Sequence, residues 1–313
     1  MTGRRPLLLL ANPTSGGKPG APEALADEPA ALLPGALLAE LRARGLEVEL
    51  HVMREGDDAR QLATSAAESG QDVVVAGGDG TVGPVAGALC GTDATLGILA
   101  TGSWNNVARS FRVPDRLPAA LDVIAEGRST RVDAGLAWHP AAEPTEEVPP
   151  DALRFFEAAG VGLDAAGFGA AEVGERHGAW RALRSAWRSL RRREASMRIV
   201  ADGKAMQTAA PAITVCNGPY MGMGFAIAPD ADPADGMLNV VVFSRMSRWE
   251  VVRHFISVAR RRPRREPRMT RLNARRVTIS GVGRVIPAHV DGRSMGTTPV
   301  EFAVDPGALR VFR

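Results

Sequence analysis

Three glycine-rich turns in the first third of the chain combine residue types that can bind a phosphate-rich ligand. They span Asn12–Lys18, Gly77–Thr81 and Thr101–Asn106. Glycine lets the backbone approach a polyanion closely, and turn N–H groups can point at its oxygens. None of the three has the Gly-x-x-x-x-Gly-Lys-Ser/Thr spacing of the P-loop. A single turn of this kind is typical of ordinary structure, but three at successive strand ends predict a polyphosphate site.

Asp79 is the acidic residue within these turns. It lies between glycines, so no bulky neighbour blocks a metal ion or a hydroxyl group from its carboxylate. Asp-Gly is also a common turn pair, and a lone Gly-Gly-Asp-Gly would more often be structural. The context of three turns makes Asp79 the candidate catalytic residue.

The elements that position the turns alternate between strand and helix. The apolar runs Leu7–Ala11, Val73–Ala76 and Leu96–Ala100 each end at a turn, and Glu47–Met53 alternates as a strand does. Stretches rich in Ala and Leu with helical spacing lie between them, at 30–44, 58–69 and 82–89. This pattern predicts an α/β domain over 1–134 with a doubly wound, Rossmann-like parallel sheet. Ligands of such sheets bind at the carboxyl ends of the strands.

After this region the pattern changes to short strand-like runs separated by Gly, Pro and Asp. We expect an antiparallel β-sandwich domain over 135–294, with the segment from about 295 to 313 returning to the first domain. Two helix-like segments interrupt the strands, 179–193 and 248–262, and the second opens with the capping box Ser247–Glu250. The strand-like runs are 153–161, 197–201, 211–216, 238–243, 277–280, 285–290, 300–304 and 309–312.

Composition indicates a globular protein in a reducing compartment. Hydrophobic residues make up 45% and charged residues 23% of the chain, and its two cysteines cannot form a disulfide framework. No apolar run reaches the roughly 18–20 residues of a membrane-spanning helix, and the apolar run near the start is too short for a signal peptide. We expect a cytoplasmic protein, with peripheral attachment to the inner face of the membrane and a homodimer as open alternatives.

Arginine is concentrated in two windows although the net charge is only +3. Residues 176–198 hold eight Arg and one acid, and residues 245–276 hold twelve Arg and two acids. Such asymmetry favours an anionic partner, and we expect an anionic membrane surface rather than nucleic acid, since no nucleic-acid-binding signature is present. In 179–193, Trp and Arg each repeat at helical spacing, which is typical of an interfacial helix. The alternatives are a Trp stripe packed on the sandwich and ordinary solvated arginines.

Taken together, the motifs resemble those of the diacylglycerol kinase catalytic-domain family, which includes bacterial lipid kinases and is related to sphingosine kinases. The family shows Asn-Pro-x-Ser-Gly, Gly-Gly-Asp-Gly-Thr and Gly-Thr-x-Asn-Asp-x-Ala-Arg. Here Asn12–Gly16, Gly77–Thr81 and Gly102–Arg109 follow in that order. Further similar motifs lie in the second domain: Gly160–Ala165, Asn217 with Gly222 and Gly224, Ala228–Ala231, Asp235–Leu238 and Asp291-Gly292.

The resemblance implies an ATP-dependent kinase that phosphorylates the hydroxyl group of diacylglycerol or a related lipid alcohol. It implies that Asp79 and Asp291 are catalytic, with Asp79 acting through Mg²⁺ or on the substrate hydroxyl. It also implies a structural Mg²⁺ held by Asp232, Asp235 and the Met237 carbonyl, although an ordinary acidic turn is the alternative. The implied nucleotide-binding residues are Asn12, Ser15, Gly16, Gly17, Gly77, Gly78, Gly80, Thr81, Thr101, Gly102, Ser103 and Asn105.

The chain departs from the family pattern at several positions. Gly83-Pro84, Ser103 and Asn106 replace the usual Asn-Glu, Thr and Asp, and Arg293 stands where the family has a Glu proposed as general base. Because Arg cannot accept a proton, the alternative function is a catalytically impaired, lipid-binding regulatory pseudokinase. NAD kinases share Gly-Gly-Asp-Gly, so a soluble acceptor is a third reading, which the Gly102–Arg109 motif disfavours.

Overall fold

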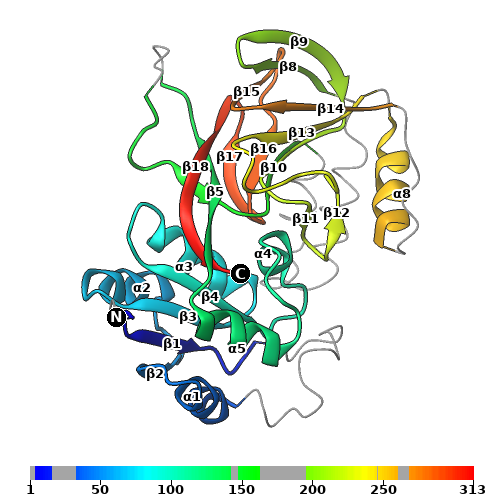
Figure 1. Ribbon diagram of the computed structural model, residues 1–313. Coiled ribbons are helices and arrows are strands. Elements are labelled where there is room, and N and C mark those ends of the chain that lie inside the picture. Colours follow the sequence, from blue (N-terminus) through cyan, green and yellow to red (C-terminus); the bar gives the residue numbers. More distant parts are fainter. Residues whose placement is uncertain (1–3, 16–32, 142–146, 163–194, 245, 260–267) are drawn as a thin grey trace. The chain divides into compact units, whose positions relative to one another are not determined.

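The computed structural model describes residues 4–15, 33–141, 147–162, 195–244, 246–259 and 268–313. The chain forms two compact units (Figure 1). The first comprises Met1–Ala134 and Pro306–Arg313, and the second comprises Gly135–Asp305. The C-terminal segment that groups with the first unit therefore begins at Pro306, later than the expected position of about 295. The predicted helix at 179–193 lies outside the described residues.

The first unit contains a parallel sheet in the order β2-β1-β3-β4. Its strands are β1 (Leu7–Ala11), β2 (Val48–Val52), β3 (Asp72–Gly77) and β4 (Thr95–Ala100). Its helices are α1 (Pro34–Ala43), α2 (Ala59–Glu68), α3 (Asp79–Leu89), α4 (Asn106–Ser110) and α5 (Leu117–Glu126). All residues of β1, β3 and β4 are buried, as expected for strands covered on both faces.

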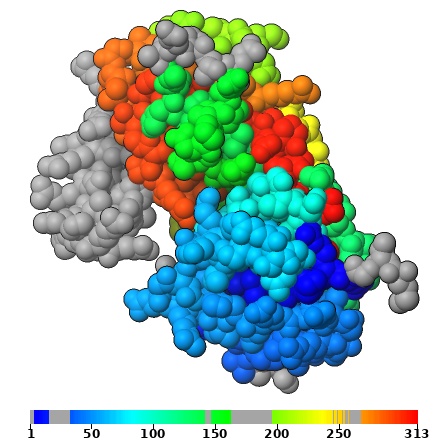
Figure 2. Space-filling model, turned by 90° about the vertical axis from the view of Figure 1, so that its left-hand side faces the viewer, coloured from blue at the N-terminus to red at the C-terminus, as the bar shows by residue number. Residues whose placement is uncertain are grey.

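Helices cover the two faces of this sheet (Figure 1). Leu37 and Leu41 of α1 and Leu121 of α5 pack in one apolar cluster with Leu7 and Leu9 of β1. Because side chains alternate along a strand, Leu7 and Leu9 lie on the same face of the sheet. Helices α2 and α3 contact each other and contribute no residue to this cluster. The blue and cyan segments of this unit pack closely together in the space-filling view (Figure 2).

The second unit is a sandwich of antiparallel sheets. One sheet has the order β14-β13-β10-β7-β16-β17, and the other is formed by β9, β8, β15 and the first half of β18. Val161, Val215 and Val240 of the first sheet share one buried cluster with Ile279 and Phe302 of the second. This arrangement, with the parallel sheet of the first unit, confirms the predicted fold class.

The elements of this part of the chain are β5 (Ser129–Trp138), which leaves the first unit, then β6 (Leu153–Phe155), β7 (Ala158–Gly162), β8 (Ala195–Ala201), β9 (Lys204–Ala210), β10 (Ala212–Cys216), β11 (Tyr220–Met221), β12 (Phe225–Ala226), β13 (Leu238–Phe243), α8 (Arg248–Ala259), β14 (Met269–Ala274), β15 (Arg276–Gly281), β16 (Pro287–Val290), β17 (Arg293–Thr297) and β18 (Val300–Phe312). Among the described residues, no helix has both the length and the hydropathy to cross a membrane.

The predicted separation of 300–304 from 309–312 is wrong, because both runs belong to β18. Between them, the N–H of Gly307 donates to Oδ1 of Asp133 at 2.7 Å, and its carbonyl accepts from Arg131 at 2.9 Å. The side chains of Asp133 and Arg131 thus satisfy the N–H and carbonyl groups of Gly307, at the point where Pro306 and Gly307 weaken strand pairing. The predicted single run at 153–161 is likewise divided, into β6 and β7.

The predicted capping box at the start of α8 is confirmed. The N–H of Ser247 donates to Glu250 Oε2 at 2.8 Å, and the N–H of Glu250 donates back to Ser247 Oγ at 3.3 Å. Arg268 also donates to Oε1 of Glu250 at 2.8 Å. The Arg268 bond, with the Ser247 bonds, lowers the pKa of Glu250 to about 2.

Candidate functional site

Two of the predicted turns lie in backbone contact at the carboxyl ends of β3 and β4. A Cβ atom on Gly102 would lie 2.4 Å from the Cα of Gly78, a distance that no side chain tolerates. Gly102 therefore requires glycine, and a Cβ on Gly78 would be tight, at 3.0 Å from the Cα of Gly102. Asn105, in the left-handed region at φ 50, fixes the third turn. Its side chain accepts from the N–H of Gly102 at 2.9 Å and donates to the Gly102 carbonyl at 2.8 Å.

Asp79 joins the second turn to the third. It is the first residue of α3, and its two carboxylate oxygens accept the N–H groups of Asn106 and Val107, each at 3.0 Å. Burial raises the pKa of Asp79, against the lowering effects of these N–H bonds and of the Arg109 charge. The arrangement yields a carboxylate of fixed orientation with increased basicity.

The first turn is tied to the other two by side-chain hydrogen bonds. Nδ2 of Asn12, directly after β1, donates to Oγ1 of Thr81 at 2.9 Å. Oγ of Ser15 lies 2.7 Å from Oγ1 of Thr101 and donates to the Asn12 carbonyl at 2.8 Å. The structure thus brings together the described members of the predicted nucleotide set. Gly16 and Gly17 lie outside the described residues.

The remaining residues of this set lie on the same turns. Gly77 ends β3, where an added Cβ would come within 3.1 Å of the Thr81 Cβ. Gly80 is exposed in the first turn of α3, and Ser103 is half-buried. The neighbouring Trp104 is 42% exposed.

In the second unit, Asp291 locks a tight turn between β16 and β17. Asp291 and Gly292 both have positive φ, 41 and 75, as a two-residue hairpin turn requires. The Asp291 carboxylate accepts the N–H of Phe156 at 2.9 Å and those of Glu157 and Ala158 at 3.1 Å each. Burial raises its pKa to about 6, although these N–H bonds oppose the shift. Asp291 thus connects the hairpin to the start of β7.

Glu157 is a carboxylate of this region that the sequence motifs did not identify. Its N–H donates to Asp291, while its Oε2 accepts the N–H of Gly222 at 3.0 Å. Glu157 therefore connects two motif turns that are far apart in the sequence. The sequence around Glu157 gives little indication of this role, since the residue merely precedes the glycines of β7. Glu157 comes close to its partners only because β7 pairs with β10 and β16. The exposed Arg293 begins β17, two residues after Asp291.

The three predicted metal ligands lie in one turn before β13. The N–H of Asp235 donates to the Asp232 carbonyl at 3.3 Å, and the N–H of Met237 donates to Oδ1 of Asp235 at 2.9 Å. Oδ1 of Asp232 is a buried oxygen. In the described parts of the chain, no group of three His, Cys, Asp or Glu side chains could hold a metal ion, so a cation here would need the Met237 carbonyl. An oxygen-only set of this kind fits Mg²⁺.

Comparison with known proteins extends over nearly the whole chain. Residues 6–137 match the family described as "Diacylglycerol kinase catalytic domain", and residues 158–313 match "YegS C-terminal NAD kinase beta sandwich-like domain". The chain is 30% identical over 287 residues to a "Diacylglycerol kinase" of Mycobacterium tuberculosis, which covers 88% of each chain. It is 41% identical over 98 residues to a "Probable lipid kinase YegS-like" of Cronobacter sakazakii, which covers 30% of this chain and 33% of the relative.

The fold is also similar to that of a solved structure. A putative diacylglycerol kinase from Bacillus anthracis superposes with a TM-score of 0.73 at 21% identity, over 98% of this chain and 96% of the other.

Proposed function

Because the chain belongs to the diacylglycerol kinase family of bacterial lipid kinases, we propose that it transfers a phosphoryl group from ATP to the hydroxyl group of diacylglycerol or a related lipid alcohol. The main support is the joining of three glycine turns at the carboxyl ends of β1, β3 and β4. There the Gly78–Gly102 contact and the bonds of Asp79 create one backbone-rich surface. Such a surface suits the phosphates of a nucleotide.

Within this proposal, the chain supplies mainly positioning and charge, as phosphoryl transfer requires. The turns that contain Asn12, Gly77–Thr81 and Thr101–Asn105 hold the nucleotide phosphates. Asp79 accepts the proton of the lipid hydroxyl group, for which its raised pKa is favourable. Alternatively, its carboxylate would help to hold an Mg²⁺ ion, which would neutralise charge on the phosphates. A second Mg²⁺, held by Asp232, Asp235 and the Met237 carbonyl, would cross-link that turn.

A catalytically impaired, lipid-binding protein is the alternative function, and it is favoured by the residues around Asp291. Arg293 cannot accept a proton, and the three N–H bonds of Asp291 assign its carboxylate to turn stabilisation. Proton acceptance would then depend on Asp79, or on Glu157 in the second unit. General-base catalysis typically contributes about 10²–10⁴-fold, so its loss leaves a slow kinase and not necessarily an inactive one.

The test of this proposal is a transfer assay with radiolabelled ATP, Mg²⁺ and a panel of lipid alcohols that includes diacylglycerol, resolved by thin-layer chromatography. We expect label in a phospholipid product. Absence of labelled lipid, combined with measurable binding of the same lipids, would establish the alternative.

An anionic membrane surface is the partner that we propose for the Arg-rich windows. In the described part of the second window, Trp249 in the first turn of α8 is 63% exposed and Arg253 is also exposed. Trp beside basic residues is typical of elements that bind at the membrane interface.

A further inference from the structure

Strand β9 forms a free edge of the ten-stranded sheet. It pairs with β8 on one side, and in the described parts of the chain no strand pairs with its other side. It lies at the outer border of the second unit (Figure 1). All seven residues of β9 pair with β8 in one unbroken register, without a bulge. A long and regular edge of this kind offers its unpaired N–H and C=O groups to another strand.

The turn between β8 and β9 determines which backbone groups point away from β8. Asp202 and Gly203 both have positive φ, 45 and 78, as in a two-residue hairpin of type I′. The flanking residues Ala201 and Lys204 then form a hydrogen-bonded pair, and such pairs alternate with non-hydrogen-bonded ones along the strands. The outward N–H and C=O groups of β9 therefore belong to three residues whose side chains are exposed, Ala205, Gln207 and Ala209.

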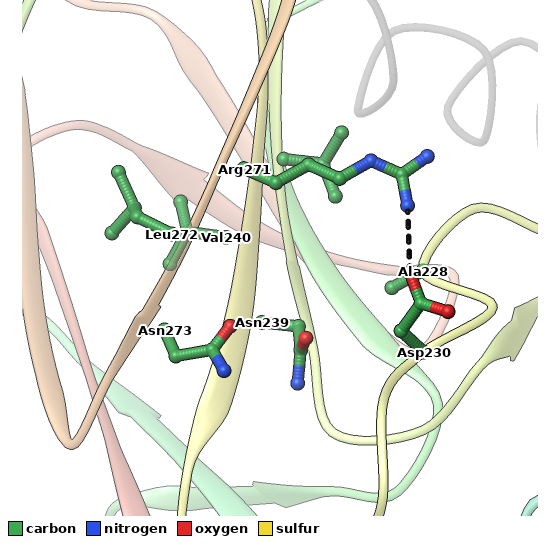
Figure 3. A pocket seen from close by; sticks show the side chains of 8 residues that line it. Ala228, Asp230, Asn239, Val240, Arg271, Leu272 and Asn273 are labelled. Atoms are coloured by element: carbon green, nitrogen blue, oxygen red, sulfur yellow. Dashed lines mark ion pairs between the residues drawn. The ribbon is translucent and has the colours of Figure 1, made fainter. Parts of the chain in front are cut away.

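The other edges of the two large sheets carry features that hinder pairing with a further strand, as is usual in natural proteins. Arg42 donates to a backbone carbonyl of β2 at 2.9 Å. Nε2 of His139 lies 2.6 Å from the carbonyl oxygen of Met295 in β17. β14 carries Arg271, whose guanidinium lies 3.8 Å from the carboxylate of Asp230 (Figure 3), and β6 has only three residues. In β9, no residue after the first is charged or proline.

The sequence of β9 suits pairing with a second copy of itself. Its outward residues read Ala-Gln-Ala, which is the same in both directions. Two antiparallel copies related by a two-fold axis at Gln207 would place Gln207 opposite its own copy and Ala205 opposite Ala209 of the second copy. In this register all three outward N–H groups and all three carbonyls have partners, and no like charges face each other.

The inner face of the strand is compatible with the same register. Met206 is half-buried and packs against the core of the sandwich, and in the pair it would lie opposite Thr208 of the second copy. The pairing therefore covers apolar surface at the rim of the core, in addition to the backbone groups.

We propose that two copies of this chain associate through β9, so that the ten-stranded sheet continues from one molecule into the other. Since one short strand contributes most of the contacts, the dimer is weak, with a Kd in the micromolar range. The inference concerns β9 alone and does not depend on kinase activity.

The first test is sedimentation velocity of the full-length protein over a series of concentrations. Gln207→Lys and Gln207→Glu each place two like charges opposite each other at the axis, and each should weaken association about fivefold. An equimolar mixture of the two variants should associate at least as well as the wild type, because Lys then faces Glu. Both variants lose the same bond of Gln207 to Ser196 Oγ, at 3.0 Å, so recovery in the mixture reports the pairing alone. Gln61→Lys makes the same charge change at an exposed position of α2 and should leave association unchanged.

The second test is hydrogen–deuterium exchange resolved to single residues, at low and at high protein concentration. The outward amides of Ala205, Gln207 and Ala209 should become protected only at high concentration. Those of Met206 and Thr208, which bond to β8, should be protected at both.

Two results would overturn the proposal. One is a protein that stays monomeric, with the outward amides of β9 unprotected, over the whole concentration series. The other is association that the two Gln207 variants leave unchanged, or that their mixture does not restore, since the contact between copies would then lie elsewhere. Circular dichroism of each variant checks that it is folded.

Discussion

Asp79 and Asp291 are both carboxylates held by backbone N–H groups, but they differ in what those bonds connect. Asp79 joins two turns of the candidate phosphate surface through Asn106 and Val107. Asp291 joins a hairpin to a strand through three N–H groups. The first arrangement places a carboxylate beside a proposed ligand, whereas the second serves the architecture of the sandwich. We therefore propose that Asp79 carries the chemistry and that Asp291 positions the hairpin; the predicted catalytic role of Asp291 stays a prediction.

Replacement of Asp79 by Asn should abolish transfer while the fold survives. The change removes the charge and turns one acceptor into a donor that faces a backbone N–H. We expect turnover to fall by about 10²-fold or more, measured with the radiolabelled lipid assay. Asp122→Asn makes the same charge change on an exposed side chain of α5 and should leave turnover unchanged. Full turnover in Asp79→Asn would show that the site is assigned wrongly.

Replacement of Arg293 by Glu tests whether this position limits the reaction. If the residue merely stands where a proton acceptor is missing, the new carboxylate should raise turnover on a lipid alcohol, by up to about 10²-fold. Arg284→Glu introduces the same charge change at another exposed position of the second unit and controls for altered electrostatics. A decrease confined to Arg293→Glu would instead mean that the arginine binds substrate or holds the site together.

Asp291 should give stability a distinctive dependence on pH. Its pKa in the folded protein, about 6, lies above the ordinary value of 3.8, so the folded state holds this proton more tightly than the unfolded state. The contribution is therefore complete below about pH 4 and is lost as the pH rises through 6. Between pH 4.5 and 7.5, the stability of the wild type relative to Asp291→Asn should fall by about 2 kcal/mol. Urea unfolding of both proteins measures this difference. A difference in the free energy of unfolding that stays constant with pH would contradict the raised pKa of Asp291 in the folded protein.

At the scale of elements, the close contact of two turns makes Gly102 the most sensitive glycine of the site. An alanine there would place its Cβ 2.4 Å from the Gly78 Cα and 2.8 Å from Asn105 Oδ1, so the turns must separate. We expect a loss of about 1–3 kcal/mol in stability and the loss of nucleotide binding. Urea unfolding and titration with a fluorescent ATP analogue measure these two quantities.

Gly87 in α3 is the matched control for this change. Its added Cβ would meet only the end of the flexible Arg60 side chain, at 3.5 Å, so Gly87→Ala should stabilise the helix by about 0.5–1 kcal/mol and preserve binding. Nucleotide affinity that is equal in both variants would show that the contact of the two turns is not needed.

The sequence predicted those elements whose signal is local. The runs before the three turns are wholly apolar, and they form β1, β3 and β4 as expected. The polar, Ala-rich β9 was not predicted, because its strand conformation depends on pairing with β8. Glu157 was missed for the same reason, since its bond to Gly222 spans 65 positions and no motif marks it.

At the scale of the whole molecule, the two units share one strand. The first residues of β18 pair antiparallel with β15 in the second unit, and its last residues pair parallel with β4 in the first. The sequence predicted two separate strands here, because Pro306 and Gly307 have a low propensity for strand. That propensity does not include the hydrogen bonds of Gly307 to the side chains of Asp133 and Arg131. The chain thus crosses between the units twice, along β5 and along β18.

A strand that serves two cores allows each core to be weakened separately. Val311 and Val300 are both fully buried in β18, where Val311 is paired with Leu96 and Val300 with Ile279. Each change to alanine should cost about 2 kcal/mol through lost burial and a cavity. Such a loss corresponds to roughly 30-fold faster opening of the affected core when exchange follows local unfolding.

Hydrogen–deuterium exchange read by mass spectrometry distinguishes the two cores. Val311→Ala should accelerate exchange in peptides from β3 and β4, whereas Val300→Ala should accelerate it in peptides from β8 and β15. The two variants are controls for each other, since residue type, strand and burial are the same. If either variant accelerates exchange equally in all four strands, the units unfold as a single cooperative structure. The shared strand would then couple the stability of the nucleotide turns to that of the sandwich.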